Sequence, residues 1–268
     1  MPVAAGLCQP ERRFPDGLAP GWAYTAGMAG RVRRQGSVVC RPMAFWSPAV
    51  HGLLRYLETV RFPAPRLVGT HGNQEILTWI EGESGSDGWA KIVPEDGLRR
   101  WAAFLRRYHD AVAGYRPDPT SRWSGGPGGC GPAEVICHGD FGPWNGVWQD
   151  GQIVGLLDFD HAGPAVPQFD IAYALEYAIP FRDDNECLSW LRYPAAPDRR
   201  RRIEIFCDAY GVAVPDNVAQ LVAWQQRLVL QRCEDLGRQG VEPQATWVSN
   251  GSLDATRRWI AWTESLQI

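Results

Sequence analysis

The fold is decided by the stretch Val135-Ile136-Cys137-His138-Gly139-Asp140-Phe141-Gly142-Pro143-Trp144-Asn145 and by a second one, Leu156-Leu157-Asp158-Phe159-Asp160. Asn145 follows Asp140 by five residues, and Asp158 follows Asn145 by thirteen. Each stretch begins with an apolar run that is typical of a short buried strand. Phosphoryl transfer from a nucleotide needs one carboxylate that orients a hydroxyl and accepts its proton. It also needs an amide oxygen and a second carboxylate that hold Mg²⁺ against the phosphates. The two stretches contain this set of groups.

This order of residues, His-Gly-Asp-x-x-x-x-Asn and then Leu-Asp-Phe-Asp, resembles the aminoglycoside phosphotransferase and choline kinase family. Members of that family are small-molecule kinases with a protein-kinase-like fold. The resemblance covers residues 27–177 by motif. The later segments resemble the family only in that they are predicted to be helices. The alternative is a hairpin whose polar loop contains Asp and Asn by chance. Two motifs in the right order, each at a strand end, favour the resemblance over that alternative.

The resemblance implies an α+β, bilobal protein-kinase-like fold. A small N-terminal antiparallel sheet with one helix would bind the nucleotide against a larger, mainly helical C-terminal lobe. We expect the N-terminal lobe to span residues 1–80, with 1–20 as a poorly ordered lead-in, and the catalytic and substrate-binding lobe to span 81–268. Residues 81–88, rich in Gly, Ser and acidic residues, are predicted to be the linker.

Hydrophobic periodicity predicts the elements of both lobes. Strands are expected at 28–34, 37–41, 67–69 and 75–80, and a helix is expected to start at Ser47-Pro48, with Ser47 as its N-cap. In the second lobe we expect a loop at 120–132 and helices at 98–112, 169–179, 199–210, 218–237 and 253–267.

The composition of the 268 residues is that of an ordinary globular enzyme, with 45% hydrophobic and 21% charged residues. A net charge of −3 gives no general attraction to nucleic acid or to an anionic membrane. No apolar run approaches the roughly 20 residues of a membrane helix, and the N-terminus lacks the apolar stretch of a secretion signal. The seven cysteines are scattered without metal or redox spacing, which suits reduced thiols. We therefore expect a cytoplasmic protein that binds neither nucleic acid nor membrane.

Four residues of the motifs receive site roles. Asp140 is the candidate general base; its structural alternative is a loop cap. Asn145 and Asp158 are the candidate Mg²⁺ ligands, with Asp160 as a secondary one, because oxygen ligands suit this ion. The alternative for Asn145 is a turn residue. The family places the main metal role on the first acidic residue of the second motif, which is Asp158 here.

Two further residues are expected to brace the catalytic loop. His138 resembles the family's catalytic-loop histidine, which holds the loop through hydrogen bonds and takes no part in the chemistry. Asp170 resembles a family aspartate that caps the following helix and steadies the loop, although helix capping alone would explain it.

The nucleotide side departs from the family pattern. Kinase-like folds place a lysine on the third strand against the phosphates and pair it with a glutamate of the next helix. The single lysine of this chain, Lys91, lies beyond the predicted linker, and Arg41 stands at the expected position. The following helix has no early glutamate: His51 is nearest, and Glu58 lies two turns on. This pattern leaves Arg41 without a predicted carboxylate partner.

A guanidinium can bind phosphate through two hydrogen bonds, and a buried one needs an anion. We therefore expect Arg41 to bind the nucleotide phosphates. The alternative is an arginine that reaches solvent, in which case Arg31 or Arg33 would serve instead. Thr78, Trp79 and Ile80, at the end of the last strand before the linker, are expected to be further nucleotide contacts.

The sequence thus predicts a phosphotransferase that needs Mg²⁺ and uses ATP or GTP to modify a hydroxyl. The acceptor would be a small molecule, for example an aminoglycoside-like antibiotic, or a peptide hydroxyl in natural-product biosynthesis. A non-catalytic immunity or regulatory protein is the other class, which the missing Lys–Glu pair favours and the intact motifs oppose. A cationic aminoglycoside would need clustered carboxylates, and the candidates are Glu176, Asp183, Asp184, Glu186, Glu234 and Asp235.

Overall fold

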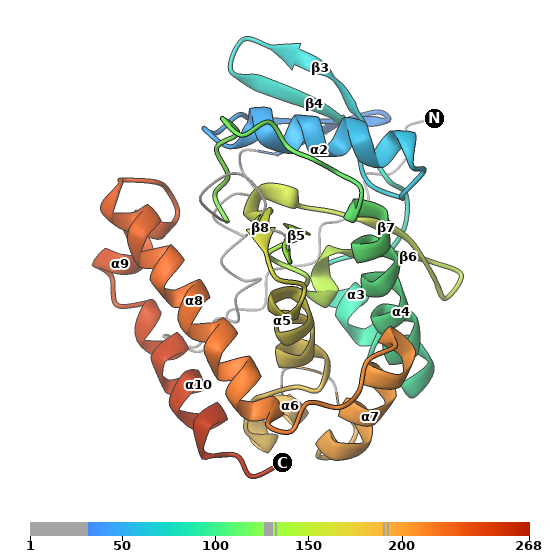
Figure 1. Cartoon of the computed structure of the whole chain (residues 1–268), viewed down its shortest axis with the longest axis vertical. Helices are drawn as coiled ribbons and strands as arrows, with labels where there is room; N and C mark the ends of the chain where they lie inside the picture. Colours follow the sequence, from blue (N-terminus) through green and yellow to red (C-terminus); the bar gives the residue numbers. More distant parts are fainter. Residues whose placement is uncertain (1–31, 126–130, 132, 190, 192) are drawn as a thin grey trace, which may run out of the picture.

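The smaller, N-terminal lobe is a four-stranded antiparallel sheet with one helix packed across it (Figure 1). The computed structural model describes residues 32–125, 131, 133–189, 191 and 193–268. The strand order is β1-β2-β4-β3, and the strands are β1 (Arg33–Gln35), β2 (Val38–Pro42), β3 (Leu67–His71) and β4 (Gln74–Thr78). Helix α2 (Ser47–Thr59) turns Val50, Leu53, Leu54 and Leu57 into the core.

The larger lobe is mainly helical. Its helices are α3 (Ser86–Lys91), α4 (Glu95–Val112), α5 (Gln168–Ala178), α6 (Asp184–Ser189), α7 (Arg199–Tyr210), α8 (Val218–Arg238), α9 (Gln244–Ser249) and α10 (Leu253–Ser265). Helix α5 lies at the centre: every residue from Phe169 to Ala178 is buried. Helices α4, α7 and α8 pack against it, and α9 and α10 pack against the outer side of α8 (Figure 1).

Two small antiparallel pairs between α4 and α5 carry the motifs. Strand β5 (Val135–Cys137) pairs with β8 (Gly163–Ala165), and β6 (Gly146–Gln149) forms a hairpin with β7 (Gln152–Leu156). The 3₁₀ turns η2 (Pro143–Asn145) and η3 (Phe159–His161) flank the hairpin. The backbone N–H of Leu157 donates to the carbonyl of Asn145 at 2.8 Å. Pairing of β6 with β7 therefore brings the ends of the two motifs together, although thirteen residues separate Asn145 from Asp158.

The expected α+β, bilobal architecture is confirmed, and the predicted helices of the larger lobe lie within a few residues of the observed ones. The linker prediction is wrong at both ends of 81–88: residues 86–88 belong to α3, and Glu83 forms a bridge with Trp148 of β6. Ser47 is the first residue of α2 rather than its N-cap; its Oγ accepts a hydrogen bond from Ala44 N–H at 2.9 Å. The predicted lead-in, 1–20, and the start of the strand at 28–34 lie outside the described residues. Within the described part of the chain, the helices are all too short or too polar to cross a membrane.

Candidate active site

The loop after β5 is held by two buried side chains. His138 donates from Nε2 to the carbonyl of Leu157 at 2.9 Å and accepts from Asp140 N–H at Nδ1, at 3.3 Å. Burial lowers the pKa of His138, so the ring is neutral with its proton on Nε2. Gly139 adopts φ +77°, and a Cβ there would lie 2.0 Å from the carbonyl oxygen of His161. This position therefore requires glycine.

Asp170, on α5, is the second holding residue. Its carboxylate accepts the backbone N–H groups of His138 at 2.7 Å and Gly139 at 2.9 Å, and contacts His109 Nε2 at 3.2 Å. Burial alone would raise the pKa of Asp170, but the hydrogen bond and charge of His109 lower it. The expected capping role is wrong, because Pro167 is the N-cap of α5 and no side chain caps that end. The carboxylate of Asp170 instead connects α5 to the catalytic loop through these hydrogen bonds.

Asp140, the candidate base, is buried and has both carboxylate oxygens engaged. Asn145 Nδ2 donates to Oδ2 at 2.9 Å, and the hydroxyl of Tyr173 on α5 donates to Oδ1. Burial and the neighbouring charge of Asp158 raise the pKa of Asp140 to about 7. This carboxyl therefore titrates in the range in which a general base exchanges protons most readily.

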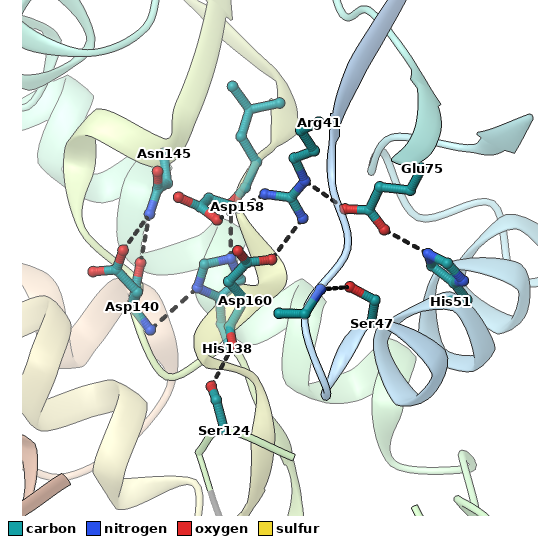
Figure 2. Close-up of polar contacts among 12 residues, drawn as sticks. Arg41, Ser47, His51, Glu75, Ser124, His138, Asp140, Asn145, Asp158 and Asp160 are labelled. Atoms are coloured by element: carbon teal, nitrogen blue, oxygen red, sulfur yellow. Dashed lines mark hydrogen bonds and ion pairs between the residues drawn. The ribbon is translucent and has the colours of Figure 1, made fainter. Parts of the chain in front are cut away.

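The candidate metal ligands lie on the side of Asp140 that faces the smaller lobe. Asn145 turns its amide nitrogen to Asp140 and its carbonyl oxygen away from it (Figure 2). Asp158 has the left-handed φ of 61°, and its side chain keeps 32% of its surface exposed. These oxygen donors, with Asp160 nearby, are the hard ligands that Mg²⁺ prefers. The donor chemistry of Asn145 and Asp158 suits a divalent cation, and their role as its ligands stays a prediction.

Arg41 enters this site from β2 (Figure 2). Its guanidinium binds Asp160 at 2.6 Å and Glu75 at 2.5 Å, and lies 3.4 Å from Asp158. Burial alone would lower the pKa of Arg41, but the three carboxylates raise it. The expectation that no carboxylate accompanies this arginine is therefore wrong. Its side chain is 14% exposed, so it does not reach out into solvent either.

The partner of Arg41 comes from the adjacent strand. Arg41 and Glu75 are directly opposite in the β2–β4 register, and Glu75 is 1% exposed. The second oxygen of Glu75 contacts Nε2 of His51, on α2, at 2.5 Å. Glu58 lies elsewhere and pairs with Arg66. The family's Lys–Glu pair is thus replaced by an arginine and a glutamate on neighbouring strands, and the helix supplies a histidine.

The other expected nucleotide contacts, Thr78, Trp79 and Ile80, contact protein groups in this structure. Strand β4 ends at Thr78, whose hydroxyl accepts Arg66 N–H at 2.9 Å. The ring of Trp79 lies 4.3 Å beneath the guanidinium of Arg34. Ile80 lies against Gly155 of β7. Their contact with a nucleotide stays a prediction.

Besides Glu75, the sequence did not indicate three residues on the acceptor side of the site: Tyr173, Gln226 and Arg232. Arg232, on α8, donates to the carbonyl groups of Gly139 at 3.2 Å and His161 at 3.1 Å, and so ties α8 to the catalytic loop. With Asp140 and Tyr173, the two α8 residues line a cavity of about 120 Å³. Only a spacing of three or four residues, as from Asp170 to Tyr173, could have indicated that a residue of α5 faces the loop.

Comparison with known proteins places the chain in a family of kinase-like fold. A model of the phosphotransferase enzyme family matches residues 127–205. The trifolitoxin immunity protein of Rhizobium leguminosarum bv. trifolii is 33% identical over 246 residues, which cover 89% of this chain and 90% of that protein.

Solved structures agree in fold. A protein of Ralstonia eutropha JMP134, assigned to the aminoglycoside phosphotransferases, superposes with a TM-score of 0.54 at 13% identity, over 92% of this chain and 98% of that chain. An amicoumacin kinase in complex with AMP-PNP, Ca²⁺ and Ami gives a TM-score of 0.53 at 11% identity, over 86% of this chain and 89% of that chain. At these identities the likeness concerns the fold alone.

Proposed function

Because this chain belongs to the phosphotransferase enzyme family, we propose that it transfers the γ-phosphoryl group of ATP or GTP to a hydroxyl of a small molecule. The observation that carries the proposal is the state of Asp140. A buried carboxyl with a pKa of about 7, held through both oxygens by Asn145 and Tyr173, lines a cavity together with Asp158, a proposed cation ligand. Such a group is expensive to bury and is poorly explained as a structural one.

In the proposed reaction Asp140 orients the acceptor hydroxyl and takes its proton. The acceptor oxygen forms a bond to the γ-phosphorus, and the bond from that phosphorus to the β–γ bridging oxygen breaks, releasing the nucleoside diphosphate. Tyr173 and Asn145 fix the carboxylate through one hydrogen bond to each oxygen. Asn145 and Asp158 would hold Mg²⁺, which when bound offsets the negative charge of the phosphates.

Arg41 is the proposed phosphate-binding residue of the smaller lobe. Glu75 fixes its Nε, while its two terminal nitrogens point to the larger lobe, where Asp158 and Asp160 accept them. A guanidinium held in this way presents two donors toward the space between the lobes. His51 steadies Glu75 from behind.

Arg41→Ala should weaken nucleotide binding by an estimated 1–3 kcal/mol, the value of a charge-assisted contact. It should also lower the free energy of unfolding by about 3 kcal/mol, because the buried Glu75 loses its cation. Nucleotide titration and urea unfolding measure the two effects. The matched control is Arg66→Ala, in the same lobe, whose exposed pair with Glu58 is worth at most about 1 kcal/mol. Equal results for the two variants would refute the role of Arg41.

The second candidate is a non-catalytic protein that confers immunity by binding. Two observations favour it: Arg41 already engages Asp158 and Asp160, and the 33% identical relative is named for immunity to trifolitoxin. A kinase of a peptide hydroxyl is a further alternative and would use the same site residues.

Nucleotide binding separates the enzyme from the binder. We expect millimolar ATP or GTP to raise the melting temperature by several degrees with Mg²⁺ and much less without it, because the phosphates bring four negative charges to carboxylates that only a cation can offset. The measurement is a thermal-shift series in which EDTA replaces Mg²⁺. No stabilisation by either nucleotide would favour the non-catalytic protein.

A further inference from the structure

The cavity beside Asp140 is small and lies between the catalytic loop and four helices of the larger lobe. Its volume is about 120 Å³, and α5, α8 and α10 each contribute residues at helical spacing. Whole small ligands generally occupy some 300–1,000 Å³, whereas a cavity of roughly 150 Å³ accepts a single benzene ring. A larger cavity of about 660 Å³ adjoins Arg232, but Asp140 does not line it. The space at the candidate base therefore fits one ring-sized group.

The walls of this cavity are mostly apolar and aromatic. Tyr173 and Tyr177 come from α5, and Trp247 and Trp259 from α9 and α10. Val229 and Leu253 add to the apolar surface, and the charged side chains at the cavity are Asp140, Asp158, Glu176 and Arg232. Flat aromatic walls favour a flat apolar guest, since stacked or edge-on rings gain more than area burial alone.

Two residues that line the cavity, His161 and Gln226, each have a buried polar atom without a hydrogen-bond partner among the described residues, and the amide oxygen of Gln226 needs a donor. Gln226 is 2% exposed and donates from Nε2 to Glu176 at 3.0 Å. Its Oε1 is buried and has no hydrogen-bond partner among the described residues. An amide oxygen left unpaired costs free energy, which a ligand N–H or O–H would recover.

The carboxylates available for a cationic acceptor are already engaged. At the cavity, Glu176 binds Arg182 at 3.1 Å as well as Gln226. Asp183 accepts two backbone N–H groups at the start of α6. The other four candidates from the sequence pair with arginines: Asp184 with Arg199, Glu186 with Arg182, Glu234 with Arg257 and Asp235 with Arg238. A polycation would have to displace these partners one by one.

We propose that the acceptor presents an uncharged hydroxyl on a flat apolar group of about phenol size, next to an N–H or O–H that binds Gln226. This inference rests on the proposed phosphotransferase activity for the role of Asp140, but the shape and charge of the cavity stand independently of it. The phenol oxygen would bond to the γ-phosphorus, its proton would pass to Asp140, and the nucleoside diphosphate would leave. A free phenol and a tyrosine side chain share this chemistry.

The test compares three probes on the whole protein. N-acetyltyrosine amide, a capped glycine peptide with one central tyrosine, and kanamycin are titrated by calorimetry and then assayed with Mg²⁺ and ATP or GTP. We expect at least one tyrosine probe to bind at millimolar concentration or below. That probe should raise the rate of nucleoside diphosphate release at least tenfold over the rate without a probe. Mass spectrometry should show that it gains one phosphoryl group. Preference for the capped amino acid over the peptide indicates a free small molecule, and the reverse preference indicates a peptide.

Two variants distinguish probe binding in the cavity from a general effect of introducing a phenylalanine. Thr256→Phe fills the cavity from α10 and should weaken binding of the tyrosine probe at least tenfold while the Mg²⁺–nucleotide shift persists. The control is Thr70→Phe, the same change at an exposed position of β3. If Thr256→Phe does not fold, the probe comparison on the unmodified protein decides.

The outcomes distinguish the two proposals. Stronger binding or faster phosphorylation of kanamycin, or no binding of either tyrosine probe, overturns the inference about the acceptor. Binding without phosphorylation, in a protein that binds and hydrolyses nucleotide, also overturns it. Binding of a tyrosine probe by a protein that binds no nucleotide would refute the phosphotransferase proposal and leave the cavity's preference intact.

Discussion

Asp140→Ala is expected to lower the rate of phosphoryl transfer by roughly 10²-fold or more, while nucleotide binding stays nearly unchanged. The reason is that the proton of the acceptor hydroxyl loses its acceptor, whereas Asn145, Asp158 and Arg41 remain to bind the nucleotide. Nucleoside diphosphate release and a nucleotide thermal shift, measured on the same preparation, check the two halves of this expectation. Asp110→Ala, which removes an exposed carboxylate of α4, is the matched control. A rate within a few-fold of the unmodified protein would remove Asp140 from the mechanism.

The pH profile tests the same assignment without a mutation. Only the ionised carboxylate accepts a proton, so the rate should fall about tenfold per pH unit below the pKa of about 7. Stability has the opposite dependence, because the folded-state pKa is raised above the ordinary 3.8. The stabilising contribution of the protonated group is complete below 3.8 and is lost as the pH rises through about 7. Activity therefore increases over a pH range in which this residue makes the fold less stable.

Asp158→Ala is expected to abolish the Mg²⁺-dependent part of nucleotide stabilisation, because one of two proposed ligands disappears. The same change removes a charge that raises the pKa of Asp140. Melting temperatures with ATP or GTP, in Mg²⁺ and in EDTA, should then coincide. Persistence of the Mg²⁺-dependent shift would show that the cation is held elsewhere.

The backbone conformation of Asp158 makes Asp158→Asn a better test of the lost charge than Asp158→Ala. Its φ of 61° is unfavourable for alanine by about 1–2 kcal/mol but is tolerated by asparagine. Asp158→Asn therefore removes the charge without the backbone cost. It should lose most of the Mg²⁺ effect while retaining more of the stability of the unmodified protein.

The sequence predicted best the site residues that lie close to one another along the chain. His138, Asp140, Asn145 and Asp158 lie within one loop and one hairpin, so their spacing nearly determines their arrangement. The family pattern did not indicate the partner of Arg41, because it places the acidic partner on the helix that is α2 here, whereas Glu75 lies on β4. Glu75, an acidic residue inside the strand Gln74-Glu75-Ile76-Leu77-Thr78, was the available signal, since a charged residue there needs a buried partner.

The acceptor side could not be predicted for a different reason. Tyr173, Gln226 and Arg232 meet Asp140 only through the packing of α5 and α8, whose relative placement no short motif specifies. The Glu176–Arg182 pair shows the same limit, because carboxylates that seem available in sequence acquire arginine partners only in the folded lobe.

Helix α5 has a consequence for how the site is assembled. Every residue from Phe169 to Ala178 is buried, so this helix has no face that water could solvate while its neighbours are unfolded. It becomes stable only when α4, α7 and α8 close around it, and it carries both Asp170, which holds the loop, and Tyr173, which holds Asp140. The catalytic loop therefore becomes ordered only when the larger lobe folds cooperatively as a whole. A fragment that lacks the C-terminal helices would lose the arrangement at Asp140 even though it keeps every residue of the two motifs.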